Sequence, residues 1–248
     1  MKKIILLTLI GLFVTQCSFM KAKFNVKPGQ HPETLSTTVK KDVNINYLIH
    51  LPENYKENGE TYPLLIFLHG AGERGDDINK VKAWGPPKIV EQDKSFPYIL
   101  ISPQCPEGDW WSSFTQMENL HTLILEIIDN YEIDKSRVYL TGLSMGGYGT
   151  WAMACEYPEL FAAVAPICGG GQPRVTRKMV NIPAWVFHGA KDQVVPLSES
   201  ENMVKALKEY GGNVEFTVFP EATHNSWSQA YNETDLLTWF LKHQKNNY

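Results

Sequence analysis

The sequence is poor in the residues that metal-binding, redox and nucleic-acid-binding proteins use. Its 248 residues include 4 cysteines and 7 histidines, and these show neither a Cys-x-x-Cys nor a His-Glu-x-x-His spacing. We therefore expect no metal ion and no organic cofactor. Lysine and arginine together number 23, against 27 aspartate and glutamate residues, which gives a formal net charge of -4. Because binding to a phosphate backbone needs a basic excess, we also expect no nucleic-acid partner.

A hydrophobic run long enough to span a membrane is also missing. The apolar stretch 4–14 follows Lys2 and Lys3 and is shorter than the roughly 20 residues that cross a bilayer. This combination predicts a signal peptide over residues 1–17, and thus a chain exported to the periplasm, to the outer membrane as a lipoprotein, or to the cell exterior. Cys17 lies where a bacterial lipoprotein signal places its lipidated cysteine. Two outcomes stay open: a membrane tether through a lipid on Cys17, or secretion with Cys17 removed.

The rest of the chain divides into a short linker and one domain. Residues 18–34 contain prolines and a glycine without hydrophobic periodicity, which predicts a linker. Residues 35–248 are enough for one domain with a well-buried core, and no change in composition divides them.

Strand and helix patterns alternate along this domain. The segment 39–51 alternates apolar and polar residues, which is typical of a half-exposed antiparallel strand at a sheet edge. Short, continuously apolar runs predict parallel strands buried on both faces. These runs are 62–68, 98–102, 137–142, 162–167 and 184–188. A further strand pattern lies at 214–219. Helical spacing occurs between them, at 78–92, 117–131, 147–157, 198–210 and 228–243.

This alternation predicts an α/β fold with a mostly parallel, doubly wound sheet and antiparallel N-terminal strands. Ligands of such sheets bind beyond the carboxyl ends of the strands. Only residues 168–183 separate two of the predicted strands, and no long insertion occurs elsewhere. We therefore expect no large cap domain over the binding site.

A Gly-x-Ser-x-Gly motif joins the strand predicted at 137–142 to the helix predicted at 147–157. Its sequence is Gly142-Leu143-Ser144-Met145-Gly146. So sharp a turn leaves no room for side chains at the two glycines, and it exposes the serine hydroxyl. Ser144 is therefore the candidate nucleophile.

A serine nucleophile needs a base, and the base needs a third group that fixes its tautomer. Asp192 follows the strand predicted at 184–188, and His224 follows the strand predicted at 214–219. Alone, the first is equally well explained as a turn aspartate and the second as a surface histidine. Together with Ser144 they follow the order Ser, Asp, His, each at the carboxyl end of a strand, which is the order of the α/β-hydrolase fold. We expect all three residues to be catalytic.

The glycine-rich segment LHGAGERG, residues 68–75, follows the first predicted parallel strand. It offers backbone N–H groups to the oxyanion of a tetrahedral intermediate. Met145 N–H is expected in this oxyanion hole because Met145 directly follows Ser144. Ala71 N–H is expected as the second donor. Gly72 is the alternative donor and a candidate substrate contact.

Five segments carry a resemblance to a known family: LHGAGERGDD, PQCPEGDWW, TGLSMGGYGTW, HGAKDQVVP and HNSW. They resemble serine esterases of the α/β-hydrolase superfamily, in the phospholipase/carboxylesterase-like group that is also labelled predicted peptidase or dienelactone-hydrolase-like. That group is similar to the feruloyl and acetylxylan esterases of carbohydrate esterase family one. The resemblance extends from Val39 to the C-terminus. It implies a catalytic domain over 35–248, with Ser144, Asp192 and His224 as its triad and an oxyanion donor in the loop after His69.

Three features bear on the substrate: the expected lack of a cap, the signal peptide, and Trp110 and Trp111 in a loop near the expected site. Exposed tryptophans stack on sugar or aromatic rings. We therefore expect a secreted esterase whose partner is an esterified oligo- or polysaccharide, and which removes feruloyl or acetyl groups from xylan. Three alternatives stay open: a generic short-chain carboxylesterase, a serine peptidase with the same triad, and a noncatalytic carbohydrate-binding lipoprotein on a hydrolase fold.

Overall fold

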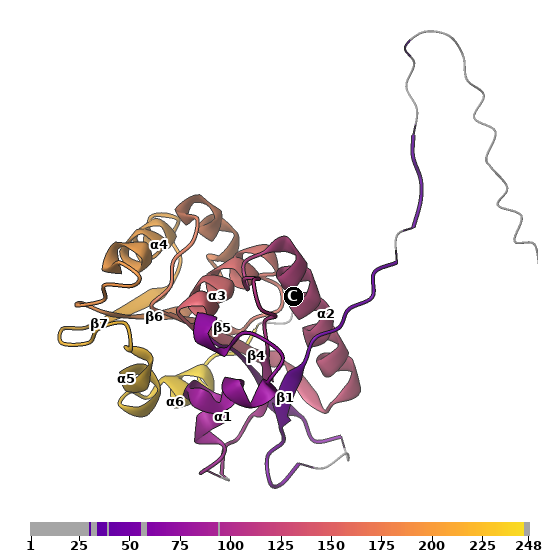
Figure 1. The fold of residues 1–248 in the computed structure, drawn as a ribbon, viewed down its shortest axis with the longest axis horizontal. Coiled ribbons are helices and arrows are strands. Elements are labelled where there is room, and N and C mark those ends of the chain that lie inside the picture. The colour runs from indigo at the N-terminus through magenta and orange to yellow at the C-terminus, as the bar shows by residue number, and fades with distance from the viewer. Residues whose placement is uncertain (1–29, 31–33, 39, 56–58, 94, 246–248) are drawn as a thin grey trace, which may run out of the picture. The chain divides into compact units, whose positions relative to one another are not determined.

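The computed structural model describes residues 30, 34–38, 40–55, 59–93 and 95–245. The predicted signal peptide, including Cys17, lies outside the described residues. All described helices and strands belong to one compact unit, Asp42–Tyr248 (Figure 1). Within the described part of the chain, no helix is both long and apolar enough to cross a membrane.

The described residues form seven strands of one sheet, in the order β1-β3-β2-β4-β5-β6-β7. Strand β1 pairs antiparallel with β3, and the other pairs are parallel. This confirms the predicted α/β fold, with β1 as the one antiparallel strand among the described residues. The strands are β1 Tyr47–His50, β2 Tyr62–Leu68, β3 Ile99–Pro103, β4 Ile133–Leu143, β5 Ala163–Ile167, β6 Ala184–Gly189 and β7 Val214–Phe219.

Helices cover both faces of the sheet. Alternate residues of β2 point to opposite faces, so that Leu64 and Ile66 lie in one apolar cluster while Leu65 and Phe67 lie in the other. The first cluster includes residues of α2, α3 and α4, and the second includes residues of α1, α5 and α6. The helices are α1 Gly85–Ile89, α2 Phe114–Asn130, α3 Met145–Glu156, α4 Leu197–Glu209, α5 Trp227–Asn232 and α6 Leu236–Phe240, with 3-10 helices at Ala71–Glu73, Ile78–Ala83 and Pro173–Met179.

Two predicted helices are broken in the structure. The segment 78–92 forms a 3-10 helix and then α1, because Gly85 adopts a φ of 65° and Pro86 and Pro87 follow it. The segment 228–243 forms α5 and α6. Between these two helices the Thr234 hydroxyl donates to Ala230 O at 2.6 Å and accepts from Leu236 N at 3.2 Å, which replaces helical hydrogen bonds at the break.

Strand burial follows the sequence pattern closely. Strands β2, β3 and β5 are buried at every position, as their continuously apolar sequences predict, and the edge strands β1 and β7 are only partly buried. Between β5 and β6 the described chain forms only the 3-10 helix Pro173–Met179. No α-helical insertion therefore lies between β5 and β6 in the described chain, next to the carboxyl ends of β4, β6 and β7 where the candidate residues follow.

Candidate active site

Ser144 occupies a strained turn between β4 and α3. Its φ of 54° and ψ of -115° lie in a region that residues with a side chain rarely adopt, at a cost on the order of 1–3 kcal/mol. The turn is held by backbone hydrogen bonds: Ser144 N donates to Ile167 O at 2.9 Å, and Ser144 O accepts from Tyr148 N at 3.1 Å. Strand β5 and helix α3 thus hold the backbone of the serine in place.

The two glycines of the motif allow a close approach of backbones. A Cβ atom added at Gly146 would lie 1.9 Å from Leu68 O, and one added at Gly142 would lie 2.5 Å from Gly146 O. Both distances are shorter than any real contact of a Cβ atom. The steric reason for the glycines in the motif is therefore visible at both positions.

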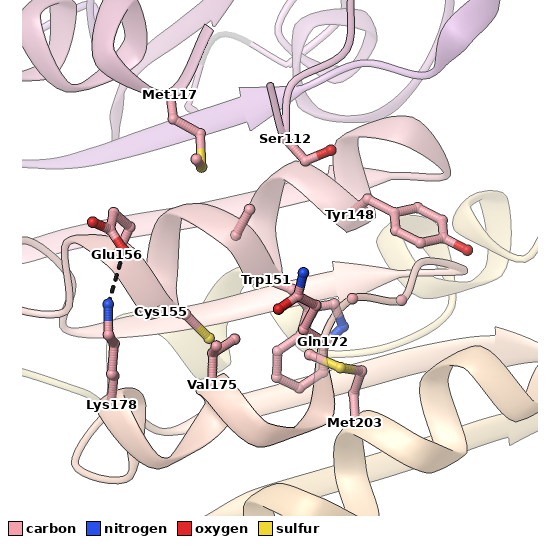
Figure 2. A pocket seen from close by; sticks show the side chains of 13 residues that line it. Ser112, Met117, Tyr148, Trp151, Cys155, Glu156, Gln172, Val175, Lys178 and Met203 are labelled. Atoms are coloured by element: carbon pink, nitrogen blue, oxygen red, sulfur yellow. Dashed lines mark hydrogen bonds and ion pairs between the residues drawn. The ribbon is translucent and has the colours of Figure 1, made fainter. Parts of the chain in front are cut away.

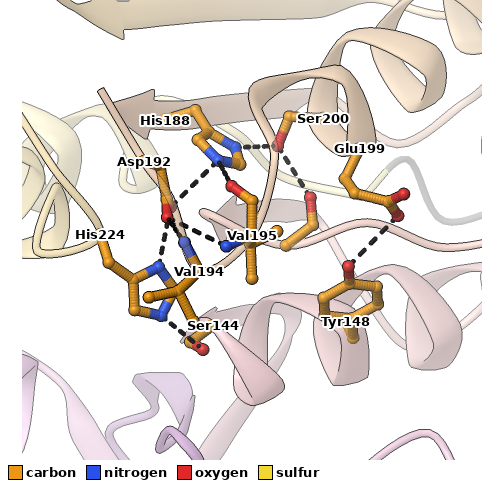
Figure 3. Close-up of polar contacts among 10 residues, drawn as sticks. Ser144, Tyr148, His188, Asp192, Val194, Val195, Glu199, Ser200 and His224 are labelled. Atoms are coloured by element: carbon orange, nitrogen blue, oxygen red, sulfur yellow. Dashed lines mark hydrogen bonds and ion pairs between the residues drawn. The ribbon is translucent and has the colours of Figure 1, made fainter. Parts of the chain in front are cut away.

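The structure brings Ser144, Asp192 and His224 together (Figure 3). His224 Nε2 lies 2.9 Å from Ser144 Oγ, and His224 Nδ1 lies 2.7 Å from Asp192 Oδ2. Because the carboxylate only accepts, Nδ1 carries the hydrogen and Nε2 is left to accept from the serine hydroxyl. The side chain of Asp192 is fully buried, whereas Ser144 is half-buried and so remains accessible to a substrate.

Close contact between the loops after β6 and β7 pairs Asp192 with His224. Ala190 N donates to Phe219 O at 2.9 Å and Lys191 N donates to Ala222 O at 2.9 Å. A Cβ atom at Gly189 would lie 2.3 Å from Thr223 O, so only glycine fits at the end of β6.

The carboxylate of Asp192 accepts hydrogen bonds at both oxygens. Oδ1 accepts from Val194 N at 2.9 Å and from Val195 N at 3.0 Å, while Oδ2 faces His224. Burial alone would raise the pKa of Asp192, but the hydrogen bonds from His224, Val195 and Val194 outweigh it and hold the pKa below its usual value. Asp192 is therefore ionised at neutral pH.

A second histidine contacts the same carboxylate. His188 Nε2 lies 3.2 Å from Asp192 Oδ2, and the side chain of His188 is fully buried. The sequence did not indicate this contact, because a histidine before glycine at a strand end, such as His69 or His188, is expected to pack or to hydrogen-bond a loop.

The glycine-rich loop lies against the residue before Ser144. A Cβ atom at Gly70 would lie 2.9 Å from Leu143 Cδ1. Ala71 begins the 3-10 helix Ala71–Glu73, and Met145 begins α3, where backbone N–H groups have no acceptor within the preceding turn. Gly72 is exposed, and a Cβ atom added there would meet no atom within 4 Å.

His69 holds this loop in shape. Cys105 N donates to His69 Nε2 at 3.0 Å, so Nδ1 carries the hydrogen and donates to Gly70 O at 2.6 Å. Burial lowers the pKa of His69 to about 4, which keeps the ring neutral and the tautomer fixed at neutral pH.

The two adjacent tryptophans have different surroundings. Trp111 is fully buried, its Nε1 donates to His69 O at 3.1 Å, and its ring leaves no exposed face for a substrate. This corrects the expectation of two exposed tryptophans: Trp111 is part of the core and bonds to the start of the glycine-rich loop. Trp110 is 47% exposed, with the guanidinium of Arg74 5.7 Å from its ring centre.

A cavity of about 320 Å³ runs along α3 (Figure 2). It begins at Tyr148, one helical turn after Ser144, and its other end is marked by the Lys178–Glu156 ion pair at 2.9 Å. Its walls are largely apolar and include Trp151 and Met203. Ser144, Asp192 and His224 do not line this cavity, which approaches the serine through Tyr148.

Among the described residues, one group of side chains is close enough together to hold a metal ion. It consists of Cys168, Asp192 and His224, whose ligand atoms lie within 4.8 Å of one another. Burial raises the pKa of the Cys168 thiol to about 12, so the thiol is protonated at neutral pH. Asp192 and His224 hydrogen-bond to each other. These residues therefore fit a proton-transfer site better than a metal site.

Residues 111–235, half of the chain, match the Dienelactone hydrolase family. The chain belongs to this family. The matched region contains all three residues Ser144, Asp192 and His224, but not the glycine-rich loop.

Proteins that are similar in sequence include esterases and a depolymerase. This dienelactone hydrolase family member is 29% identical over 140 residues to poly(3-hydroxyalkanoate) depolymerase C from Paucimonas lemoignei, which covers 51% of this chain and 32% of that protein. It is 26% identical over 188 residues to probable feruloyl esterase C from Aspergillus terreus, covering 74% of this chain and 68% of that one. Acetylxylan esterase A from Aspergillus awamori is 22% identical over 209 residues, covering 75% and 66%.

Among solved structures, a thermostable esterase is similar with a TM-score of 0.71 and 35% identity, over 81% of this chain and 60% of that one. This chain therefore spans only part of several of its relatives. The comparisons confirm the predicted resemblance to α/β-hydrolase esterases of the dienelactone-hydrolase-like group. They also agree with the predicted enzyme class, because the Aspergillus relatives and the solved structure are named esterases.

Proposed function

We propose that this chain hydrolyses carboxylic esters, with Ser144 as nucleophile, His224 as general base and Asp192 as the group that orients His224. One observation carries the proposal: hydrogen bonds of 2.7 and 2.9 Å connect Asp192 Oδ2 through His224 to Ser144 Oγ. A serine hydroxyl is a weak nucleophile until a base within hydrogen-bond reach takes its proton. The strained turn that holds Ser144 lends further support.

The proposed reaction is an acyl transfer in two halves. Ser144 Oγ attacks the ester carbonyl carbon while His224 Nε2 takes the hydroxyl proton. The resulting oxyanion accepts hydrogen bonds from Met145 N–H and Ala71 N–H. When the intermediate collapses, the ester C–O bond breaks and His224 returns the proton to the leaving alcohol. Water then attacks the acyl-serine in the same way, which releases the acid and restores Ser144.

Asp192 contributes through its charge and its fixed position. Its lowered pKa keeps the carboxylate ionised while His224 carries the extra proton. The negative charge then stabilises the positive imidazolium that forms during each half of the reaction.

For the substrate, we propose a feruloyl or acetyl ester on xylan or a related polysaccharide. The names of the Aspergillus relatives, feruloyl esterase and acetylxylan esterase, support this class. Trp110 is exposed beside the glycine-rich loop and offers a face on which a ring can stack. The cavity along α3 accommodates a group larger than acetyl.

The test compares the purified wild-type chain with Ser144→Ala. We expect the wild type to react with a fluorophosphonate probe and to release ferulate or acetate from arabinoxylan, and Ser144→Ala to do neither while keeping the wild-type melting temperature. Release of neither acid, with cleavage of aryl esters, would leave ester hydrolysis intact and refute the xylan substrate. A folded Ser144→Ala that retains activity would refute the triad, and cleavage of peptide substrates in preference to esters would refute the esterase.

We also propose that residues 1–17 direct export, followed by a linker over 18–34 and the catalytic domain over 35–248. Mass spectrometry of the exported protein tests this. A mature N-terminus after residue 17 indicates secretion, and a lipid on Cys17 indicates a membrane tether. A full-length chain retained in the producing cells contradicts export.

A further inference from the structure

His188 is a buried polar residue that the proposed reaction does not use. It lies near the end of β6, which pairs with β5 on one side and β7 on the other. Its Nε2 lies 3.0 Å from Val195 O and 3.2 Å from Asp192 Oδ2, and its Nδ1 lies 2.8 Å from Ser200 Oγ (Figure 3). Both ring nitrogens therefore have polar partners although the side chain is fully buried.

The neighbours of Nε2 fix its hydrogen. A carbonyl oxygen and a carboxylate oxygen only accept, so Nε2 carries a hydrogen and is shared between them. The Asp192 carboxylate is then faced by four donors: Val194 N and Val195 N at Oδ1, and His224 Nδ1 and His188 Nε2 at Oδ2. Val194 and Val195 belong to the same loop as Asp192, and His224 follows β7. Of the four donor residues, His188 is the one that belongs to a strand inside the sheet.

The other side of the ring connects to the turn that holds the nucleophile. Ser200 is a fully buried residue of α4, and its hydroxyl lies 2.8 Å from Gly169 O. The backbone of Gly169 packs directly on α3, since a Cβ atom added at Gly169 would lie 2.5 Å from Gly147 C. Contacts therefore run from Asp192 through His188 and Ser200 to the first turn of the helix that follows Ser144.

We propose that His188 is a positioning residue that holds the Asp192 carboxylate against His224. The inference rests on the proposed function. Asp192 belongs to the loop between β6 and α4, whose residue Val194 is 70% exposed, so backbone hydrogen bonds within that loop move with it. His188 ties the carboxylate to an interior strand, and Ser200 fixes the plane of the ring. Small errors in the placement of a catalytic group lower the rate strongly, by about 100-fold per ångström.

The experiment compares His188→Leu, His188→Gln and Ser200→Ala with the wild-type chain and Ser144→Ala. Leucine is close to histidine in volume but has no donor, whereas the glutamine amide reaches the place of Nε2 and donates from it. His121→Leu is the matched control, because His121 lies in α2 and stacks on Tyr157. For each variant, kcat and KM on 4-nitrophenyl acetate are measured from pH 5 to 9, together with circular dichroism and the melting temperature.

We expect His188→Leu to lower kcat by about 10- to 100-fold with little change in KM. The midpoint of the acid limb of the kcat/KM profile should move to lower pH, because a less firmly held Asp192 stabilises protonated His224 less. His188→Gln should recover most of the loss and restore the acid limb. Ser200→Ala should fall between His188→Leu and the wild type, and His121→Leu should match the wild type.

A folded His188→Leu with wild-type kcat and acid limb would overturn the proposal. An equal loss in His188→Leu and His188→Gln with an unmoved acid limb would also overturn it, because that marks a packing role. If His188→Leu does not fold, Ser200→Ala decides: a several-fold loss with a moved acid limb supports the proposal, and wild-type behaviour overturns it. The proposed function fails separately, when the wild-type chain does not cleave the ester or Ser144→Ala still does.

Discussion

The substitution Asp192→Asn removes one acceptor while leaving the size of the side chain almost unchanged. In the wild-type chain, Oδ1 accepts from Val194 N and Val195 N, and Oδ2 faces the N–H groups of His224 and His188. An asparagine has one carbonyl oxygen and one NH2 group, so its NH2 must face donors in either orientation.

Each orientation has its own consequence. If the NH2 faces the loop, the buried Val195 N–H loses its acceptor, at a cost of about 1–3 kcal/mol in stability. If the NH2 faces the histidines, His224 must move its hydrogen to Nε2, and Nε2 then no longer accepts the proton of Ser144. The same change in a serine protease triad costs about 10⁴-fold in kcat, or about 5 kcal/mol at 1.36 kcal/mol per factor of ten. We expect a loss of that order here.

The assay is kcat on 4-nitrophenyl acetate at pH 8, with the melting temperature as the check on folding. Asp93→Asn is the matched control, because Asp93 is exposed and, among the described residues, bonds to nearby Ser95. It should keep wild-type activity. The reasoning is refuted if Asp192→Asn is folded and its kcat stays within tenfold of the wild-type value.

Further substitutions test packing, titration and the cavity. Gly146→Ala should lower the free energy of unfolding by about 3 kcal/mol, because its Cβ would lie 1.9 Å from a backbone oxygen. Gly72→Ala is the control and should leave the stability unchanged, because its Cβ would meet no atom within 4 Å. Equal melting temperatures of the two variants would contradict this. His69 has a pKa lowered from 6.5 to about 4, so the unfolded chain takes up its proton first as the pH falls. Wild-type stability should decline by about 3 kcal/mol from pH 7 to pH 4 through this group, and chemical denaturation of His69→Gln should show a shallower decline. Ala152→Trp, which fills the cavity along α3, should lower kcat/KM for 4-nitrophenyl ferulate about tenfold relative to 4-nitrophenyl acetate, whereas Leu125→Trp on exposed α2 surface should not change the ratio.

Strands were predictable because each buried one carries a continuous apolar run. Tyr62–Leu68 is buried at every position, and its short apolar sequence YPLLIFL is typical of a strand covered on both faces. The start of β4 at Ile133 was not predictable in the same way. Its residues Asp134 and Arg137 are polar and bond to each other at 2.6 Å, so their side chains interrupt the apolar pattern while the backbone already pairs in the sheet.

Helix boundaries were less predictable where a break depends on backbone geometry. Periodicity alone extends a helix through Trp84 and Gly85, although Pro86 and Pro87 signal its interruption. The break before Leu236 has no comparable signal in the sequence. There the side chain of Thr234 satisfies backbone groups at the break, and such bonds become visible only in the folded chain.

The proximity of Ser144, Asp192 and His224 was predictable because it follows from topology. Parallel strands end at the same edge of a sheet, so residues that follow β4, β6 and β7 come together whatever their distance in the sequence. His188 was not predictable, because its contact with Asp192 depends on how the loop after β6 folds back on its own strand. His188 and Asp192 are four residues apart in the sequence, and across a turn this spacing does not indicate whether their side chains meet.

Trp111 shows why residue type is a weak guide to substrate contact. From the sequence, Trp110 and Trp111 are equally good candidates for substrate contact. In the structure, Trp110 is exposed and Trp111 is buried. Trp111 fills the space beside Gly149, where an added Cβ atom would lie 2.5 Å from Trp111 Cβ, and its indole N–H satisfies the carbonyl of His69. The buried ring thereby supports the loop that carries the proposed Ala71 donor. Of the two tryptophans, only Trp110 is therefore exposed enough to stack on the proposed substrate.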